Sequence, residues 1–260
     1  ALSGDSVLLD TSVGLPSGKL TLAATHDVTL GDRAHVDLSG RSIVFNDVTK
    51  HSWGGDLTMT SASGNIVQSG ASVIDVSAAN NEAGSITATA TGTGQGSVAL
   101  AGAASGGYLG GGITIAAQTL GDFAALNRKL TAAGFLKSRS FDLKQGDLAV
   151  GNEVVAHAVT IAVDGGSLTV NGTINASGVT PGTIRLSARD TLELASSGVL
   201  DAHGTQLQVD SYGQPVAASN RATVELTTSQ GLLKLDNGAT IDDRVTDASN
   251  VDPVSGKPVS

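Results

Sequence analysis

Apolar and small polar residues alternate along most of the chain in runs of four or five positions. These runs cover residues 19–23, 27–30, 35–38, 56–60, 112–116, 183–187, 191–194 and 223–227. A period of two is typical of a strand with one buried face, and the Gly, Asp and Ser residues between the runs favour turns. The pattern therefore predicts a succession of short, half-buried β-strands.

A longer repeat runs through these strands. Five segments share a small residue, a spacer, an aliphatic residue and then Asp or Asn before a polar turn, at residues 34–40, 72–78, 172–178, 198–204 and 239–243. An Asp or Asn side chain at such a corner accepts hydrogen bonds from the backbone amides that follow it. Between copies the chain usually supplies two further strands, as residues 184–186 and 192–194 do before Leu200.

Three short strands per repeat predict an all-β fold, a parallel β-helix or solenoid, whose coils stack about 4.8 Å apart. A β-sandwich would contain strands of similar length, but it gives no reason for the recurring aliphatic-Asp corner. The composition agrees with a narrow solenoid interior, because only 3% of the residues are aromatic and the core must consist of Val, Leu, Ile and Ala.

One segment departs from the alternation. Residues 122–134 place four apolar side chains on one helical face, with Asp122 as the candidate N-cap and Gly134 directly after the last turn. We expect this helix to cover the side or an open end of the solenoid. The predicted organisation is β-helix coils over residues 1–118, a helical insertion and loop over 119–141, coils of the same solenoid over 142–245, and a linker or disordered tail over 246–260.

Charge and composition exclude several classes of partner and site. The net charge is −9 and no Lys/Arg run exceeds two residues, which argues against binding to nucleic acids or to anionic membrane surfaces. Without cysteine the chain forms no disulfide and no thiolate zinc site. No apolar run approaches the roughly 18 residues that span a bilayer. Residue 1 is not Met and no signal peptide is recognisable, so we expect a fragment of a longer chain.

A set of short segments occurs in a characteristic order among Leu-Thr-Leu rungs. They are Phe-Ala-Ala-Leu at 123–126, Ser-Arg-Ser-Phe at 138–141, Gln-Gly-Asp at 145–147, Ile-Arg-Leu-Ser-Ala-Arg at 184–189 and Asp-Ser-Tyr-Gly at 210–213. The rungs resemble the filamentous haemagglutinin family, the large exoproteins of bacterial two-partner secretion. The order of the segments resembles that of an uncharacterised domain in some very large members.

This resemblance implies a right-handed β-helix that leaves the cell through a partner outer-membrane pore and is secreted or held on the bacterial surface. Roles in the family include adhesion to host cells, aggregation, biofilm formation and contact-dependent inhibition. The chain would be an interior part of the shaft, or an elaboration upon it, because the Asn-Pro motifs of the N-terminal secretion domain are not recognisable here.

Candidate chemistry is sparse. The five histidines (His26, His35, His51, His157 and His203) are scattered, with none at metal-ligand spacing to another histidine, and the calcium-binding nonapeptide of some solenoids is absent. The Asp242-Asp243 pair lies inside a corner copy, where a turn explains it. The sequence therefore predicts no catalytic residue, no cofactor and no metal site.

Two surface features allow other functions. Arg185, Arg189, Asp190 and Glu193 form the best local cluster for a polysaccharide-degrading enzyme, but alternation predicts an exposed ion-pair ladder instead. Residues 87–91 place three Thr on one face, which we interpret as a single exposed strand rather than a binding array.

Residues that depart from the rungs are the candidate partner contacts, because exposed aromatic and Arg side chains are common anchors. They are Trp53, Tyr108, Phe123, Arg139, Phe141 and Tyr212. Trp53, the only Trp, would alternatively fill a coil corner. We predict a shaft that presents loops to a host-cell or bacterial receptor or glycan. The alternatives are a β-helical polysaccharide-degrading enzyme and a purely structural spacer of a contact-dependent inhibition exoprotein.

Overall fold

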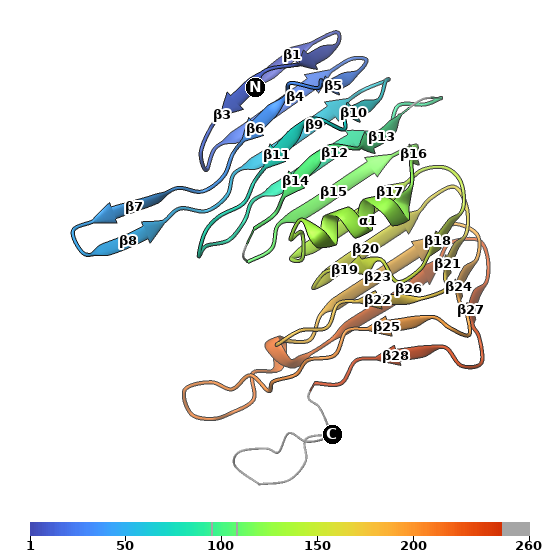
Figure 1. Cartoon of the computed structure of the whole chain (residues 1–260). Coiled ribbons are helices and arrows are strands. Elements are labelled where there is room, and N and C mark those ends of the chain that lie inside the picture. Colours follow the sequence, from blue (N-terminus) through green and yellow to red (C-terminus); the bar gives the residue numbers. More distant parts are fainter. Residues whose placement is uncertain (95, 108, 246–260) are drawn as a thin grey trace. The chain divides into compact units, whose positions relative to one another are not determined.

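The computed structural model describes residues 1–94, 96–107 and 109–245 (Figure 1). The chain divides into two compact units, residues 1–146 and residues 147–260. Both units consist mostly of short strands that pair in parallel, which is the arrangement of a parallel β-solenoid. Parallel pairing excludes the antiparallel β-sandwich. The predicted tail over 246–260 lies outside the described residues.

Three parallel sheets make up the first unit, and each coil from β1 to β14 contributes one strand to each sheet. The first sheet contains β1 (Leu2–Gly4), β4 (Lys19–Ala24), β9 (Asp56–Ser61), β12 (Ser85–Ala90), β15 (Gly112–Ala117) and β17 (Ser138–Leu143). The second contains β2 (Val7–Leu9), β5 (Val28–Leu30), β10 (Ile66–Gln68), β13 (Ser97–Leu100) and β16 (Thr119–Leu120). The third contains β3 (Ser12–Gly14), β6 (His35–Asp37), β11 (Val73–Asp75) and β14 (Ala103–Ser105).

The second unit repeats this plan with three further groups of parallel strands. One group holds β20 (Ala158–Val163), β23 (Thr183–Ala188) and β26 (Thr223–Thr228). Another holds β18 (Leu148–Val150), β21 (Leu168–Val170), β24 (Leu192–Leu194) and β27 (Leu233–Leu235). The last holds β19 (Val154–Val155), β22 (Thr173–Asn175), β25 (Val199–Asp201) and β28 (Thr240–Asp242). A short 3₁₀ helix, η1 (Ala217–Asn220), precedes β26.

Alternation along each strand builds the core. Ile86 of β12 lies in register between Leu57 of β9 and Ile113 of β15, and none of the three is more than 1% exposed. Each such side chain stabilises the fold by roughly 1.5–3 kcal/mol relative to an exposed one. The strands predicted from the period-two pattern, including β4, β9, β15 and β23, are confirmed.

All five predicted corners are confirmed. Each one lies at the end of the third strand of its coil. The Asp or Asn side chain accepts a hydrogen bond from the backbone amide two residues later in every copy, over donor–acceptor distances of 2.8–3.2 Å. The acceptor side chains are Asp37, Asp75, Asn175, Asp201 and Asp242.

The predicted helix is present as α1 (Phe123–Ala132), and its caps are those that the sequence predicts. The Asp122 side chain accepts a hydrogen bond from the Ala125 amide (2.8 Å). Gly134 adopts φ +82°, and the amides of Gly134 and Phe135 donate to the carbonyls of Thr131 and Leu130. This pairing is the Schellman motif, which requires a left-handed residue directly after the helix.

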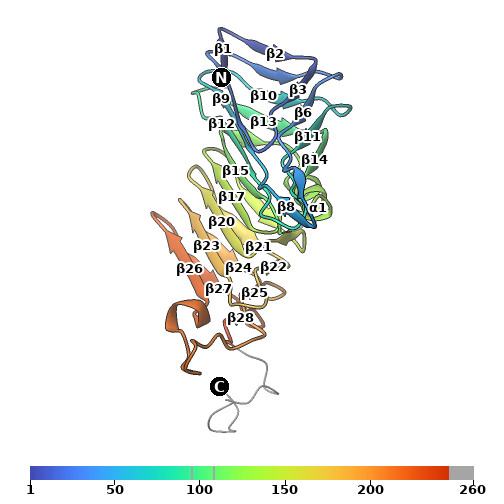
Figure 2. The same cartoon turned by 90° about the vertical axis from the view of Figure 1, so that its left-hand side faces the viewer.

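The helix takes the place of a third-sheet strand in the coil that follows β14. The third sheet of this unit ends at β14, and Figures 1 and 2 both show α1 beside that strand. The Gly106 amide, one residue after β14, donates to the Ala133 carbonyl at the end of the helix (2.7 Å). No helix within the described part of the chain is both long enough and apolar enough to cross a membrane.

A buried arginine fixes α1 to the strand that follows it. Arg139 of β17 points into the coil and is 1% exposed. Its guanidinium donates to the Phe135 carbonyl (3.0 Å), to the side-chain oxygen of Asn127 (3.0 Å) and to the hydroxyl of Thr131 (2.9 Å). Burial lowers the pKa of Arg139 to about 10. The hydrogen bonds from the guanidinium to these oxygen atoms offset part of the cost of its burial.

The insertion is shorter than the predicted range of 119–141. β16 already covers Thr119–Leu120, and β17 starts at Ser138 in register with β15. The strand escaped prediction because Arg139 occupies an inward position, where alternation predicts an apolar residue.

Replacing Asp75 tests the corner hydrogen bond. Asp75→Ala removes the acceptor of the Ser77 amide, so we expect the free energy of unfolding to fall by about 1 kcal/mol. Asp75→Asn should change it little, since Asn175 fills the equivalent corner. Urea denaturation followed by circular dichroism measures both, and equal stability of the Ala variant and the parent would contradict the role of the corner.

Replacing Arg139 tests the attachment of α1. Arg139→Met keeps much of the side-chain volume but removes the donors to Phe135, Asn127 and Thr131, which should cost about 2–4 kcal/mol. Arg185→Met is the matched control, because Arg185 forms an exposed pair with Glu225 and should cost less than about 1 kcal/mol. A loss for Arg139→Met no larger than that of the control would show that the buried network is not what holds α1.

Candidate binding site

The six predicted contact residues fall into three groups. Phe123, Arg139 and Phe141 are buried, and the rings of Phe123 and Phe141 meet edge to face with their centroids 4.9 Å apart. A buried side chain offers a partner no surface, so their location does not support a role as contacts. Trp53 and Tyr212 are 62% and 87% exposed, whereas Tyr108 lies outside the described residues. The alternative in which Trp53 fills a coil corner is wrong, because its side chain faces solvent.

Trp53 follows an antiparallel hairpin formed by β7 (Ser42–Phe45) and β8 (Val48–His51). Figure 1 shows this hairpin extending away from the sheets of its unit. It begins directly after the Asp37 corner and is closed at its base by hydrogen bonds between Arg41 and Ser52. The sequence analysis missed it, because the two-residue turn Asn46-Asp47 lacks the glycine of the usual hairpin signals; Asn46 adopts φ +53° in its place.

The hairpin carries exposed apolar side chains on both faces. Register pairs Phe45 with Val48 and Ile43 with Lys50, so these four share one face. Phe45 and Ile43 are 63% and 54% exposed, and Val44 on the opposite face is 68% exposed. A two-stranded hairpin buries too little by itself to be stable in water, so an isolated apolar one indicates a contact surface.

A second insertion arises at the equivalent corner of the other unit. Residues 205–222 follow the Asp201 corner and return to β26, as the hairpin follows Asp37 and returns to β9. Asp210 accepts hydrogen bonds from the amides of Tyr212 and Gln214, which leaves the Tyr212 ring in solvent. In both units, therefore, the connection after the Asp corner is where the chain departs from the coil.

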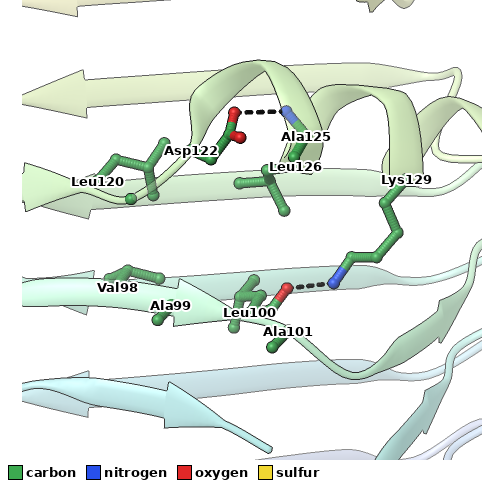
Figure 3. A pocket seen from close by; sticks show the side chains of 10 residues that line it. Val98, Ala99, Leu100, Ala101, Leu120, Asp122, Ala125, Leu126 and Lys129 are labelled. Atoms are coloured by element: carbon green, nitrogen blue, oxygen red, sulfur yellow. Dashed lines mark hydrogen bonds between the residues drawn. The ribbon is translucent and has the colours of Figure 1, made fainter. Parts of the chain in front are cut away.

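An apolar hollow of about 300 Å³ lies between β13 and α1 (Figure 3). Lys129 reaches across it from the helix and donates to the carbonyl oxygens of Leu100 and Gly102. Its ammonium group supplies donors to a strand edge that β16 leaves partly unpaired, since β16 pairs only with Ser97 and Val98. Burial lowers the pKa of Lys129, but both of these contacts are structural.

The structure brings together one cluster that sequence spacing did not reveal. Asp201 and Asp242 are register neighbours on β25 and β28, and ligand atoms of both lie within 4.8 Å of His203. Two carboxylates and an imidazole can in principle hold a divalent cation. Here His203 Nδ1 lies 2.6 Å from Asp201 Oδ1, and Arg244 donates to Asp242 (2.6 Å), so protein groups already occupy the carboxylates.

Where the acidic side chains of two corners are register neighbours, an arginine lies beside them. In the first unit Asp37 is a register neighbour of Asp75, and Arg41 donates to Asp37 over 2.6 Å. Hydrogen bonds from Ser39 and Arg41 lower the pKa of Asp37 to about 2. Arg244 likewise lowers the pKa of Asp242. These ion pairs and hydrogen bonds stabilise the corners.

The charged cluster considered for an enzyme consists of surface ion pairs, as predicted. Arg185 pairs with Glu225 (2.7 Å), Arg189 with Asp190 (3.0 Å) and Glu193 with Lys234 (2.7 Å). Exposed pairs of this kind contribute little to stability.

The threonine row extends over more coils than we expected. Thr87 is a register neighbour of Thr58 on one side and Thr114 on the other, and Thr21 precedes Thr58. The residues alternate with buried ones, so these hydroxyl-bearing side chains share the outer face of the first sheet. The prediction of an outward-facing strand at this place is confirmed, and the neighbouring coils add further Thr side chains to the same face.

Comparison with protein-family models, with curated proteins and with solved structures found no match for the chain.

Proposed function

We propose that the chain is a segment of a secreted or surface-exposed bacterial adhesin, in which β-solenoid coils form a rigid shaft and the insertions contact another cell. On this proposal the coils are right-handed, as in the filamentous haemagglutinin family, and a two-partner secretion pore in the outer membrane exports the parent chain.

The β7–β8 hairpin is the observation that carries the proposal. Its exposed Ile43, Val44 and Phe45 contribute nothing to the coil interior, yet exposed apolar side chains at such density favour aggregation. A surface of this kind is expected where a protein meets a partner. Arg41 is paired with Asp37, and Lys50 is accompanied by Asp47 in the turn, so the apolar side chains rather than charge define this surface.

The parallel sheets within each unit support the proposal of a shaft. Each coil is hydrogen-bonded to its neighbours along whole strands, as between β9, β12 and β15, and its interior is packed with aliphatic side chains. Such a scaffold holds an insertion at a fixed place with little conformational freedom, which lowers the entropy lost when the insertion binds.

Binding of fluorescently labelled folded protein to epithelial cells and to bacteria of the same strain tests this function. We expect saturable binding to one cell type that heat-unfolded protein lacks. The double variant Val44→Ser/Phe45→Ser should weaken it about tenfold or more, because it removes the two most exposed apolar side chains of the hairpin.

Thr49→Ser is the matched control, since Thr49 is a polar residue of the same hairpin and pairs with Val44. It should bind like the parent. Absence of saturable binding to either cell type would contradict adhesion and favour a spacer. Unchanged binding by the double variant would remove the hairpin from the contact surface.

A further inference from the structure

A second surface of the first unit, separate from the apolar hairpin tip, has the features of a ligand site. A hollow of about 320 Å³ lies where β9, β12, β15 and β17 begin. This volume falls at the lower end of the range for small-molecule sites. Its lining residues are Trp53, Gly54, Asp56, Glu82, Ala83, Gly84, Ser85, Gly112, Lys137 and Ser138.

The floor of the hollow lacks bulky side chains at its centre. The first residues of the four strands lie in register as Asp56, Ser85, Gly112 and Ser138. A Cβ added to Gly84 would lie 1.8 Å from the Gly55 carbonyl oxygen, so only glycine fits there and the backbone stays bare. The floor therefore presents backbone and small hydroxyl groups to whatever lies on it.

The walls of the hollow carry an aromatic ring and charged groups. Trp53 borders one side with 62% of its surface exposed. Lys137 and Glu82 form an ion pair over 2.7 Å, and Asp56 accepts a hydrogen bond from the Ser85 hydroxyl (2.8 Å). An indole combines a flat apolar face with one N–H donor, and carboxylates and hydroxyls accept and donate around it.

The hollow continues onto a face covered with hydroxyl groups. Two residues further along the same strands, Thr58, Thr87, Thr114 and Ser140 are register neighbours on the outer face of the sheet. A chain-like ligand that starts in the hollow thus meets a row of hydroxyl groups spaced by the separation of strands, about 4.8 Å.

We infer that this surface binds a neutral saccharide chain, with one sugar ring stacked on Trp53 and its hydroxyl groups bonded to Asp56, Ser85 and the Glu82–Lys137 pair. A pyranose has an apolar C–H face and a rim of hydroxyl groups, which match the ring of Trp53 and the polar groups of the hollow. The inference names a ligand for the proposed adhesive segment. It rests on that proposed function in one respect, namely that the glycan belongs to the surface of another cell.

Charge decides between neutral and anionic saccharides. Lys137 is paired with Glu82, and Lys19, which lies beside the hollow, is paired with Asp56 over 3.4 Å. Neither cation is left in excess over the carboxylates, so a sulfated, sialylated or uronic-acid chain would meet no compensating charge. A neutral saccharide chain does not need a compensating charge, so the equal number of cations and carboxylates does not weaken its binding.

Because Trp53 is the only Trp of the chain, its fluorescence reports on this surface alone. The probes are linear neutral oligosaccharides of gluco, galacto and manno configuration, with sialyllactose and a heparin oligosaccharide as charged counterparts. We expect at least one neutral series to change the Trp53 emission saturably and to reduce its quenching by acrylamide, while the charged probes leave it unchanged. No change with any neutral probe up to about 10 mM, or a response to the charged probes alone, would overturn the inference.

Variants locate the binding. Asp56→Asn should weaken the fluorescence-detected affinity about tenfold, and Trp53→Ala should weaken it at least as much by isothermal titration calorimetry. Tyr212→Ala is the matched control, because it removes an exposed aromatic ring from the insertion of the other unit and should leave the affinity unchanged. Full affinity in Trp53→Ala would place the saccharide elsewhere.

The result is distinguishable from a failure of the adhesive function. Purified oligosaccharides test the hollow without any cell, whereas the Val44/Phe45 double variant tests the hairpin on cells. Saccharide binding without cell binding would uphold this site and remove the adhesive function. Cell binding without saccharide binding would do the reverse.

Discussion

Each described corner depends on one hydrogen bond, in which the side-chain oxygen of an Asp or Asn accepts from the backbone amide two residues later. A solenoid coil must change direction between strands while its backbone amides are withdrawn from water, and an unpaired buried amide is costly. At Asp37, Asp75, Asn175, Asp201 and Asp242 the side chain supplies the acceptor locally. The corner therefore needs no partner from a distant part of the chain, and coils of one design can follow one another.

Repetition of the corner creates an electrostatic cost that the structure meets with nearby cations. Register brings Asp37 beside Asp75 and Asp201 beside Asp242. Like charges at the separation of neighbouring strands repel, and the repulsion is lowered by Arg41 in one unit and by Arg244 in the other. This arrangement explains the only cluster of potential metal ligands among the described residues as a requirement of the fold.

The same corner determines where the chain can depart from the coil. The β7–β8 hairpin follows Asp37 and residues 205–222 follow Asp201, and each insertion returns to the first strand of the next coil. Because the corner is complete before the insertion begins, residues added there do not disturb the strand ladder. Trp53 and the hollow beside it lie at the end of such an insertion, where a side chain from the inserted loop meets the flat face of the first sheet.

Features that depend on contacts between residues close in sequence could be predicted from the sequence. Features that depend on how the coils stack could not. The corners and the caps of α1 were predictable because Asp122, Gly134 and the Asx residues act on amides within a few positions. β17 was missed because Arg139 faces inward, and its partners on α1 become visible only when helix and strand are in contact. The column of Thr58, Thr87 and Thr114 depends on the number of residues in each coil, which a single sequence does not give.

Amide hydrogen exchange followed by mass spectrometry tests most directly whether the coils are a rigid scaffold and the insertions are separate from it. The expected result is slow exchange in β9, β12 and β23, with exchange at least about 100-fold faster in the β7–β8 hairpin and in residues 205–222. The amides that donate to corner side chains, such as that of Ser77, should be as slow as the strands. Exchange of strands, corners and insertions at similar rates would contradict a coil scaffold stabilised at its corners.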